Sequence, residues 1–514
     1  MNEMPSSNAE EKRTDSSTRS LDSVLALFEA GDDTSNFVAI SLLRSILDDR
    51  EELREDRETL LKCWNTIPTT FLRRLLRSKP SKKRTEEEAQ SMVGLAVAIT
   101  HAFFNLLPRE VIEHQLRDRA DDLVAAVPFS SPATISQISQ ILLALNFPSL
   151  LFSDIAKASG SSSALSSYLF IKMLLIDIRS TISSLQEMLN SPEYLKTSMR
   201  ITESFDIISN FIGYLMRCLD EDDSSDGSTG KSELQFEPSQ LLQLRADISE
   251  TMSLTIEHVR DRFDASVAGA AGLHPSARTA PHPTSSAVRA ISWQSADVSM
   301  SDDPLTLSEI RALALWLRED DNDALRREAA GIIDVLFYLY SEAHSEVDFR
   351  SPVLIALEGI LTVPEGVESF LNEDGWSILS KGLQNALNSD GARAEAQGVD
   401  TVRVLLAVVE SEVTGPSKED WMNVVGLAVK EMRGSPSKDV KRLDLHIAVS
   451  QLAVELLSKA PKGLRKKYAS HISILGQLAR AKLAAADGER EEGLMEVIDG
   501  LEALDIRKSQ SASD

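Results

Sequence analysis

Apolar residues recur along most of the chain at the three- and four-residue spacings that place side chains on one face of an α-helix. In the stretch 325–340 the apolar side chains follow this spacing throughout, while Arg326, Arg327, Glu328 and Asp334 fall largely off that face. Similar patterns cover 21–28, 310–317 and 402–409, and Thr306 and Ser308 are cap candidates for the helix around Ile310. We therefore expect amphipathic helices, with 325–340 forming one continuous face.

Signals for β-structure are poor. Alternating β-branched runs joined by Asn-Gly or Asp-Gly turns are essentially missing, and aromatic residues make up only 5% of the chain. A chain of 514 residues is also too long for all its helices to share one core. The pattern predicts an all-α protein, an armadillo/HEAT-like α-solenoid of stacked helix pairs with no sheet.

The stretch 351–387 gives the clearest repeat. It contains an apolar helix over 354–361, a break at Pro364–Gly366, a short amphipathic helix and then a long helix beginning near Trp376. Gly375 suits a left-handed residue that ends the short helix and turns the chain. This order is typical of one armadillo-like unit, and such units recur every 40–47 residues or so.

Four segments have compositions that do not favour a packed core. The predicted organisation is a disordered tail at 1–18, an N-terminal armadillo-like helical region at 19–266, a disordered linker at 267–303, a C-terminal armadillo-like helical region at 304–506 and a disordered tail at 507–514. An acidic disordered loop at 220–232 interrupts the N-terminal region. In that loop Ser224, Ser225 and Ser228 lie among carboxylates and form a possible phosphorylation site, a plain solvated loop being the alternative.

Charge and residue usage exclude several functions. The formal net charge of -25 disfavours nucleic acid and anionic membranes as partners. The two cysteines, Cys63 and Cys218, are too few and too far apart for a disulfide framework or a zinc site, and no metal-binding histidine motif is present. We expect no metal, no cofactor, no secretory signal and no transmembrane segment. The expected location is cytoplasmic, and the basic runs 79–84 and 462–467 keep the nucleus possible.

Two near-motifs do not predict catalysis. Gly227–Ser232 resembles a phosphate-binding loop, but the first glycine should stand where Ser225 is, and an acidic run precedes it instead of a strand. Gly160–Ala164 resembles a nucleophile elbow, but Ala164 occupies the position of the second glycine. We read both as loops and expect no enzymatic activity.

Several segments resemble the neurochondrin family. The opening segments 21–28 and 36–44, the stretch Trp64–Leu76, the block Ile310–Tyr340 and the segment 370–387 are similar to blocks of that family in the same order. The resemblance implies an armadillo-like helical protein of the cytosol that binds signalling or trafficking proteins, without catalytic residues. Animal members are linked to neurite outgrowth, a role that we do not extend to this chain because organisms without neurons would have no use for it.

These observations together predict a non-enzymatic scaffold that binds other proteins, of unknown identity, on its helical surface. Because the chain is acidic, we expect basic or amphipathic peptides as partners. The alternative is a HEAT-repeat-like adaptor or assembly factor that acts as a subunit of a larger complex. The residues alone do not indicate which face binds or the oligomeric state.

Overall fold

The computed structural model describes residues 21–49, 56–145, 163–223, 236–268 and 299–510, apart from short gaps at 22, 82–83, 128–129, 189–190, 192, 344–346, 390, 434–441, 484–485 and 487. It is an all-helical fold. The described residues contain no strand, and their one β-feature is an isolated bridge between Ser81 and Arg84. The prediction of an all-α, armadillo-like solenoid is confirmed.

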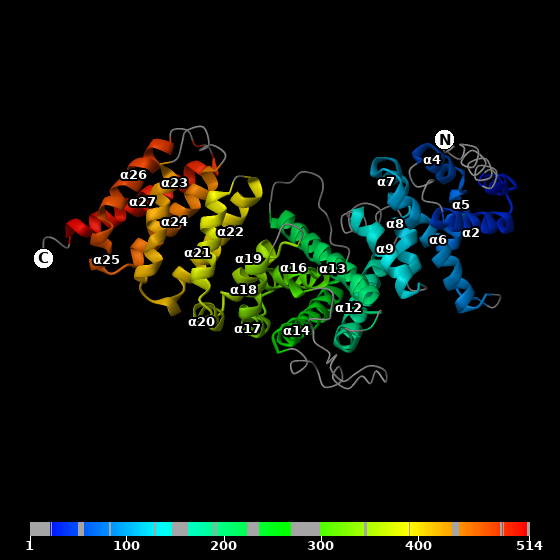
Figure 1. Cartoon of the computed structure of the whole chain (residues 1–514), viewed down its shortest axis with the longest axis horizontal. Coiled ribbons are helices and arrows are strands. Elements are labelled where there is room, and N and C mark those ends of the chain that lie inside the picture. The colour runs from blue at the N-terminus through cyan, green and yellow to red at the C-terminus, as the bar shows by residue number, and fades with distance from the viewer. Residues whose placement is uncertain are drawn as a thin grey trace, which may run out of the picture. The chain divides into compact units, whose positions relative to one another are not determined.

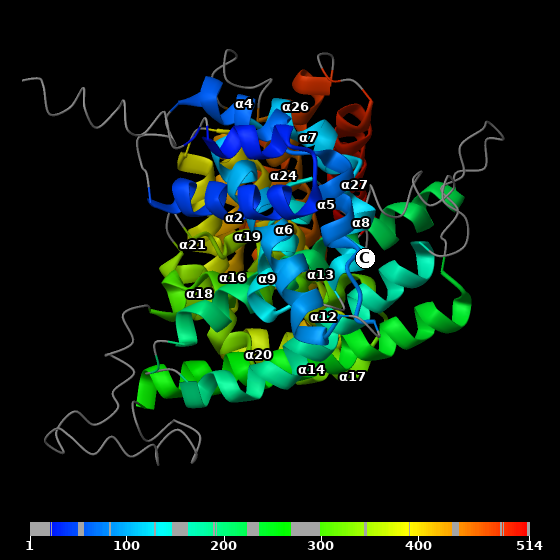
Figure 2. The same ribbon diagram turned by 90° about the vertical axis from the view of Figure 1, so that its right-hand side faces the viewer.

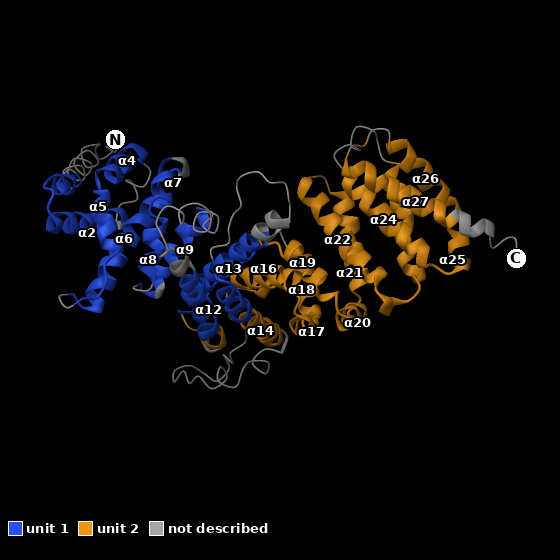
Figure 3. Ribbon diagram, turned by 180° about the vertical axis from the view of Figure 1, so that it is seen from behind, with its two compact units in different colours: residues 1–181, 192–248 blue, residues 182–191, 249–514 orange. Residues whose placement is uncertain are grey.

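The chain divides into two compact units (Figure 3). Unit 1 comprises residues 1–181 and 192–248, and unit 2 comprises residues 182–191 and 249–514. Two long helices, α12 (Ser163–Met188) and α14 (Pro238–Ala268), contribute residues to both units. The division crosses both of these helices, and the linker predicted at 267–303 lies mostly outside the described residues and stays a prediction.

Unit 1 is built on a row of successively packed helices, in which α2 packs on α6, α6 on α9 and α9 on α13, with α5 and α8 packed beside them (Figures 1 and 2). Burial of Val93, Val97 and Phe103 on α6 shows why this helix is central. The helices are α2 (Asp33–Asp49), α4 (Arg57–Thr66), α5 (Thr69–Leu76), α6 (Glu86–Leu106), α7 (Arg109–Arg117), α8 (Ala120–Ala126), α9 (Pro132–Ala144), α12 (Ser163–Met188), α13 (Glu193–Asp223) and α14 (Pro238–Ala268).

By length and composition, α6 is also apolar enough to cross a membrane. Its apolar side chains pack against α2, α5 and α9, as expected for the core helix of a helical stack.

Unit 2 has a longer row of the same kind, in which α16, α19, α22, α24 and α27 pack in succession. A second layer holds α17, α18, α20, α21, α23 and α26. The bounds are η4 (Met300–Asp302), α16 (Pro304–Glu319), α17 (Asp323–Ala330), α18 (Ile333–Glu342), α19 (Arg350–Ile360), α20 (Pro364–Asn372), α21 (Gly375–Asn388), α22 (Ala392–Glu410), η5 (Glu412–Thr414), η6 (Glu419–Met422), α23 (Asn423–Met432), α24 (Leu443–Lys459), α25 (Lys462–Lys467), α26 (Ala469–Leu483) and α27 (Glu489–Gln510).

Polar pairs between neighbouring repeats reveal the length of the repeat. Arg393 pairs with Asp348, and Arg403 with Glu358, in both cases across 45 positions. Farther along, Gln451 donates to Glu496 across 45 positions, and Arg490 pairs with Asp444 across 46. This interval matches the spacing expected for armadillo-like units.

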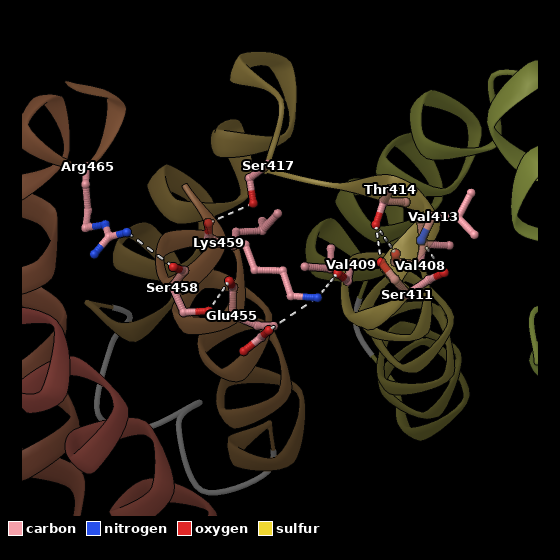
Figure 4. A network of polar contacts seen from close by, with 11 residues as sticks. Val408, Val409, Ser411, Val413, Thr414, Ser417, Glu455, Ser458, Lys459 and Arg465 are labelled. Atoms are coloured by element: carbon pink, nitrogen blue, oxygen red, sulfur yellow. Dashed lines mark hydrogen bonds and ion pairs between the residues drawn. The ribbon is translucent and has the colours of Figure 1, made fainter. Parts of the chain in front are cut away.

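A polar network fastens the ends of α22 and α24 (Figure 4). The Lys459 ammonium donates to the carbonyl of Val409 at the end of α22, and Arg465 donates to the carbonyls of Ser458 and Ala460 at the end of α24. The Ser417 hydroxyl donates to the carbonyl of Leu456 over 2.8 Å. Because helix C-termini expose unpaired carbonyls and partial negative charge, these cations and the hydroxyl stabilise both ends.

Three local expectations were wrong. The stretch 325–340 forms two helices, α17 and α18, separated at Gly331, whose amide caps the first by donating to Glu328. Thr306 and Ser308 are buried inside α16, which begins at Pro304 after the cap residue Asp303. Proline suits this first position because the amide that it lacks would be unpaired there anyway.

The third correction concerns the turn before α21. Asp374, with φ of 53°, takes the left-handed conformation that we expected at Gly375. Gly375 is instead the first residue of α21, where a Cβ would lie 2.5 Å from the Phe337 ring and 2.8 Å from the carbonyl oxygen of Phe370. The glycine thus serves close packing, and the rest of the predicted 351–387 unit is confirmed as α19, α20 and α21.

Helix ends also overlap the segments predicted to be disordered. Helix α13 includes 220–223, α14 includes 267–268 and α27 includes 507–510, while η4 and the cap residue Asp303 lie in the last part of the predicted linker. A helix can extend into polar sequence because each added residue forms a hydrogen bond to the preceding turn. Composition alone does not reveal where such an extension ends. The tail 1–18, most of the acidic loop and most of the linker lie outside the described residues.

The second half of α14 belongs to unit 2, and two buried polar pairs link it to the start of α16. His258 Nδ1 lies 2.9 Å from Glu309 Oε1, an ion-pair contact without hydrogen-bond geometry, and only 3% and 0% of the two side chains are exposed. Arg262 pairs with Asp303 over 2.6 Å, and both side chains are buried. Since removing one partner of a buried pair leaves the other without compensation, these contacts determine how α14 and α16 pack.

We expect His258→Leu to lower the free energy of unfolding by about 3–5 kcal/mol, because the Glu309 carboxylate would keep its burial and lose its imidazole partner. The double variant H258L/E309L should recover most of that loss, since an apolar pair replaces the polar one. Urea unfolding measures both. Arg480→Leu, which removes an exposed pair with Glu502, is the control and should cost less than about 1 kcal/mol. Equal losses in the single and double variants would contradict a coupled pair.

Helices α16 and α19 approach so closely that one glycine determines their separation. A Cβ at Gly359 would lie 2.6 Å from the carbonyl oxygen of Leu317. We expect Gly359→Ala to lower the free energy of unfolding by about 1–3 kcal/mol through overpacking. Gly426→Ala on α23 is the matched control: nothing lies within 4 Å of its Cβ position, so it should gain about 0.5–1 kcal/mol. Chemical denaturation measures the free energy of unfolding of both variants. A G359A variant that is more stable than wild type would contradict the proposed packing constraint at Gly359.

Candidate protein-binding grooves

The larger of two neighbouring grooves in unit 2 has a cavity volume of about 660 Å³. We call it the Tyr340 groove. Its walls come from the end of α18, the turn before α19, the second half of α21 and the start of α22. Most of its lining side chains are polar, including Asn385, Ser389 and Gln397.

Charged side chains of the Tyr340 groove are mainly cationic. The described lining has three cationic side chains, those of Arg350, Lys381 and Arg393, and one carboxylate, that of Asp348. Arg393 pairs with Asp348, and Arg350 lies 4.0 Å from the same carboxylate while donating to the Ala343 carbonyl over 2.7 Å. Asp348 is only 12% exposed, whereas Arg393 is 73% exposed. The carboxylate is therefore enclosed, and much of the positive charge faces solvent.

A tyrosine and a glycine set the spacing between α18 and α21 at this groove. Tyr340 is 5% exposed, and a Cβ at Gly382 would lie 2.1 Å from its hydroxyl oxygen. Among the described residues the hydroxyl has no hydrogen-bond partner of normal geometry. Burial raises the pKa of Tyr340, an effect that the nearby Thr401 and Gln397 side chains oppose. Any larger residue at 382 would force the tyrosine, and with it the floor of the groove, to shift.

The second groove, of about 600 Å³, lies beside α21 on the side of α20, η6 and α23. We call it the tryptophan groove. Trp376 and Trp421 stack with ring centroids 4.2 Å apart, and the Lys418 ammonium lies 5.2 Å from the Trp421 ring centre. Its described charged lining is balanced, with two lysines and two aspartates. Lys381 lines both grooves, so a chain segment bound in one would approach the other.

The structure does not bring together the candidate site residues that the sequence suggested. Ser224, Ser225 and Ser228 lie outside the described residues, so the phosphorylation loop stays a prediction. Ala164 lies in the first turn of α12, within a helix and without the strand that a nucleophile elbow requires. Within the described part of the chain no cluster of histidine, cysteine and carboxylate side chains could hold a metal ion.

The facing titratable groups of α14 and α16 form no open site. His258 and Glu309 are almost completely buried, and neither lines the two grooves or the smaller cavities near Trp64 and Phe37. Acid–base catalysis requires such groups to reach a substrate. The pair therefore contributes to the packing of α14 against α16.

In unit 1 a polar network joins α6, α9 and α13. His101 contacts the amide of Gln140, and Glu203 accepts hydrogen bonds from Gln140 and Ser136. Burial lowers the pKa of His101 and raises the pKa of Glu203. His101 thus takes part in the contact between the packed helices α6 and α9.

We expect Glu203→Gln to change the pH dependence of stability. Because the folded-state pKa of Glu203 is raised, its protonated form is favoured in the fold, and its contribution to stability is lost as pH rises through that pKa. The stability of E203Q relative to wild type should thus grow from about pH 4.5 upward and then level off. Thermal melting across pH tests this, with exposed Glu368→Gln as control. Parallel pH profiles for wild type and E203Q would contradict it.

Comparison with known proteins identifies the family. The neurochondrin family model matches residues 15–146 and 139–393, which is well over half of the chain. The chain belongs to the neurochondrin family. The predicted resemblance is confirmed. The matched residues include α18, α19 and α21, which carry most of the lining of the Tyr340 groove.

Other similarities are more distant. An uncharacterized Schizosaccharomyces pombe protein, C16C4.02c, is 21% identical over 241 residues, which cover 46% of this chain and 37% of that protein. The chain thus matches just over a third of the length of this relative. The crystal structure of SYS-1 is similar with a TM-score of 0.36 and 10% identity, covering 95% of this chain and 99% of that one.

The sequence pattern did not single out the residues of the Tyr340 groove. Asp348 and Arg393 lie 45 positions apart, so no local motif joins them. Lys381 and Gly382 fall within an ordinary amphipathic helix. The usable signal was Gly382, a glycine in the middle of a helix, which often marks close packing.

Proposed function

We propose that this neurochondrin-family protein is a non-enzymatic scaffold that binds a segment of a partner protein in the two grooves of unit 2. The family and its helical solenoid fold are in general non-catalytic and suggest a role in protein interaction. A signalling or trafficking protein as partner, and a cytoplasmic or nuclear location, are part of the proposal and rest on the family resemblance and on composition.

The observation that supports this proposal most is the pair of adjoining grooves. They have volumes of about 660 and 600 Å³ and share Lys381. Stacked repeats characteristically bind extended partners along such surfaces. Polar amides in the first groove can hydrogen-bond a peptide backbone, and the two lysines and two aspartates that line the second can pair with charged side chains of a partner.

Photo-crosslinking tests this proposal in the full-length protein. A photoreactive amino acid at Asn385, exposed in the Tyr340 groove, should give discrete adducts in cell extract. The same group at Glu368, exposed on α20 and outside both grooves, is the control and should give only background. Adducts identified by mass spectrometry should then bind the purified protein directly.

Identical adducts from both positions, or none from Asn385, would refute binding in the groove. Native mass measurement separates the two kinds of scaffold. A large, stable assembly containing the cross-linked partner would favour the adaptor or assembly factor over a scaffold with exchanging partners.

A further inference from the structure

We propose that the Tyr340 groove takes an acidic segment of the partner protein, whose carboxylates pair with Lys381 and Arg393. This inference rests on the proposed function and specifies its ligand chemistry. It also reverses, for this groove, the expectation from net charge that basic peptides would be preferred.

The first argument is the local charge. The chain as a whole carries a formal charge of -25, yet the described lining of this groove has three cationic side chains and one anionic one. That count covers the described lining alone and leaves out Glu346 and Asp390, which lie outside the described residues. A local excess of cations in an acidic protein attracts a negatively charged segment of matching size.

The second argument is that these cations have unused capacity. Lys381 is exposed and has no ion-pair partner among the described residues, so its three donors face solvent. Arg393 uses one nitrogen on Asp348 and is 73% exposed. A guanidinium has five donors and commonly binds a carboxylate through two, so Arg393 can hold Asp348 and still accept a ligand carboxylate.

The groove floor makes this arrangement stable without a ligand. Asp348 is enclosed and also accepts a hydrogen bond from the Arg350 amide over 3.0 Å, so it holds Arg393 from one side. Tyr340 packed on Gly382 keeps α18 and α21 at a fixed spacing. The cations are consequently positioned before binding, which lowers the entropic cost of association.

The same charges argue against long polyanions. Nucleic acid or an anionic membrane would extend far beyond three cations and meet the negative field of the remaining chain. A short acidic peptide meets only the groove. We therefore assign the groove to a protein segment with two or three closely spaced carboxylates.

Fluorescence anisotropy with the full-length protein tests the assignment. The probes are a fluorescein-labelled hexaglutamate peptide and a hexalysine peptide of equal length. Wild type should bind hexaglutamate, with an affinity that falls as the salt concentration rises. Hexalysine should not compete with hexaglutamate for the protein. Lys381→Glu combined with Arg393→Glu should weaken hexaglutamate binding by about tenfold or more, since two attractions become repulsions.

Two variants guard against misfolding as an explanation. Lys381→Glu alone removes no described contact and should still weaken binding severalfold. Lys430→Glu reverses an exposed charge on α23 that lines neither groove, so it should fold and bind hexaglutamate like wild type. Thermal melting confirms that each variant is folded.

Equal hexaglutamate affinity in wild type and the charge-reversed variants would overturn the assignment, as would absent binding or a preference for hexalysine. If cross-links at Asn385 nevertheless identify a partner that binds directly, the proposed scaffold function is supported and only the assignment of an acidic ligand is refuted. If neither cross-linking nor peptide binding occurs, both proposals fail.

Discussion

The close stacking of each repeat on the next is the constraint on which this structure depends. A helix such as α16 or α19 is apolar over most of its circumference and cannot bury that surface within one repeat. Neighbouring helices must therefore approach until their backbones nearly touch, as they do where Gly359 meets Leu317. A small residue at the contact is the physical condition for that approach, and the hydrophobic burial gained along the whole row maintains it.

Once stacking sets the register between repeats, the polar contacts follow from it. Pairs such as Arg403 with Glu358 and Arg490 with Asp444 recur at nearly the same interval because equivalent turns of successive helices face one another. Most of these pairs are partly exposed, so each adds little to stability. Their effect is on specificity: a repeat displaced by one turn would lose its partners and place like charges together.

The sequence predicted helical structure well because helix periodicity is a local property. The helices of 351–387 were visible for this reason, and so was the unit to which they belong. The left-handed Asp374 was missed because the reason lies elsewhere in the fold: the Phe337 ring excludes a side chain at the next position, and only glycine can stand there. The pairing of α14 with α16 is likewise not visible in the sequence, because His258 and Arg262 find partners on α16 and at its cap that spacing along the chain does not indicate.

The candidate grooves were invisible for the same physical reason, and this bears on how the protein selects partners. Net charge is a sum over the whole surface and governs long-range encounter, whereas binding depends on charges within a Debye length of about 8–10 Å. At that range a ligand in the Tyr340 groove meets Lys381 and Arg393 more strongly than distant carboxylates. An acidic chain with a local cationic groove therefore repels extended polyanions and still admits a short acidic peptide. The overall charge then acts as a filter on the size of the ligand, and the groove determines its chemistry.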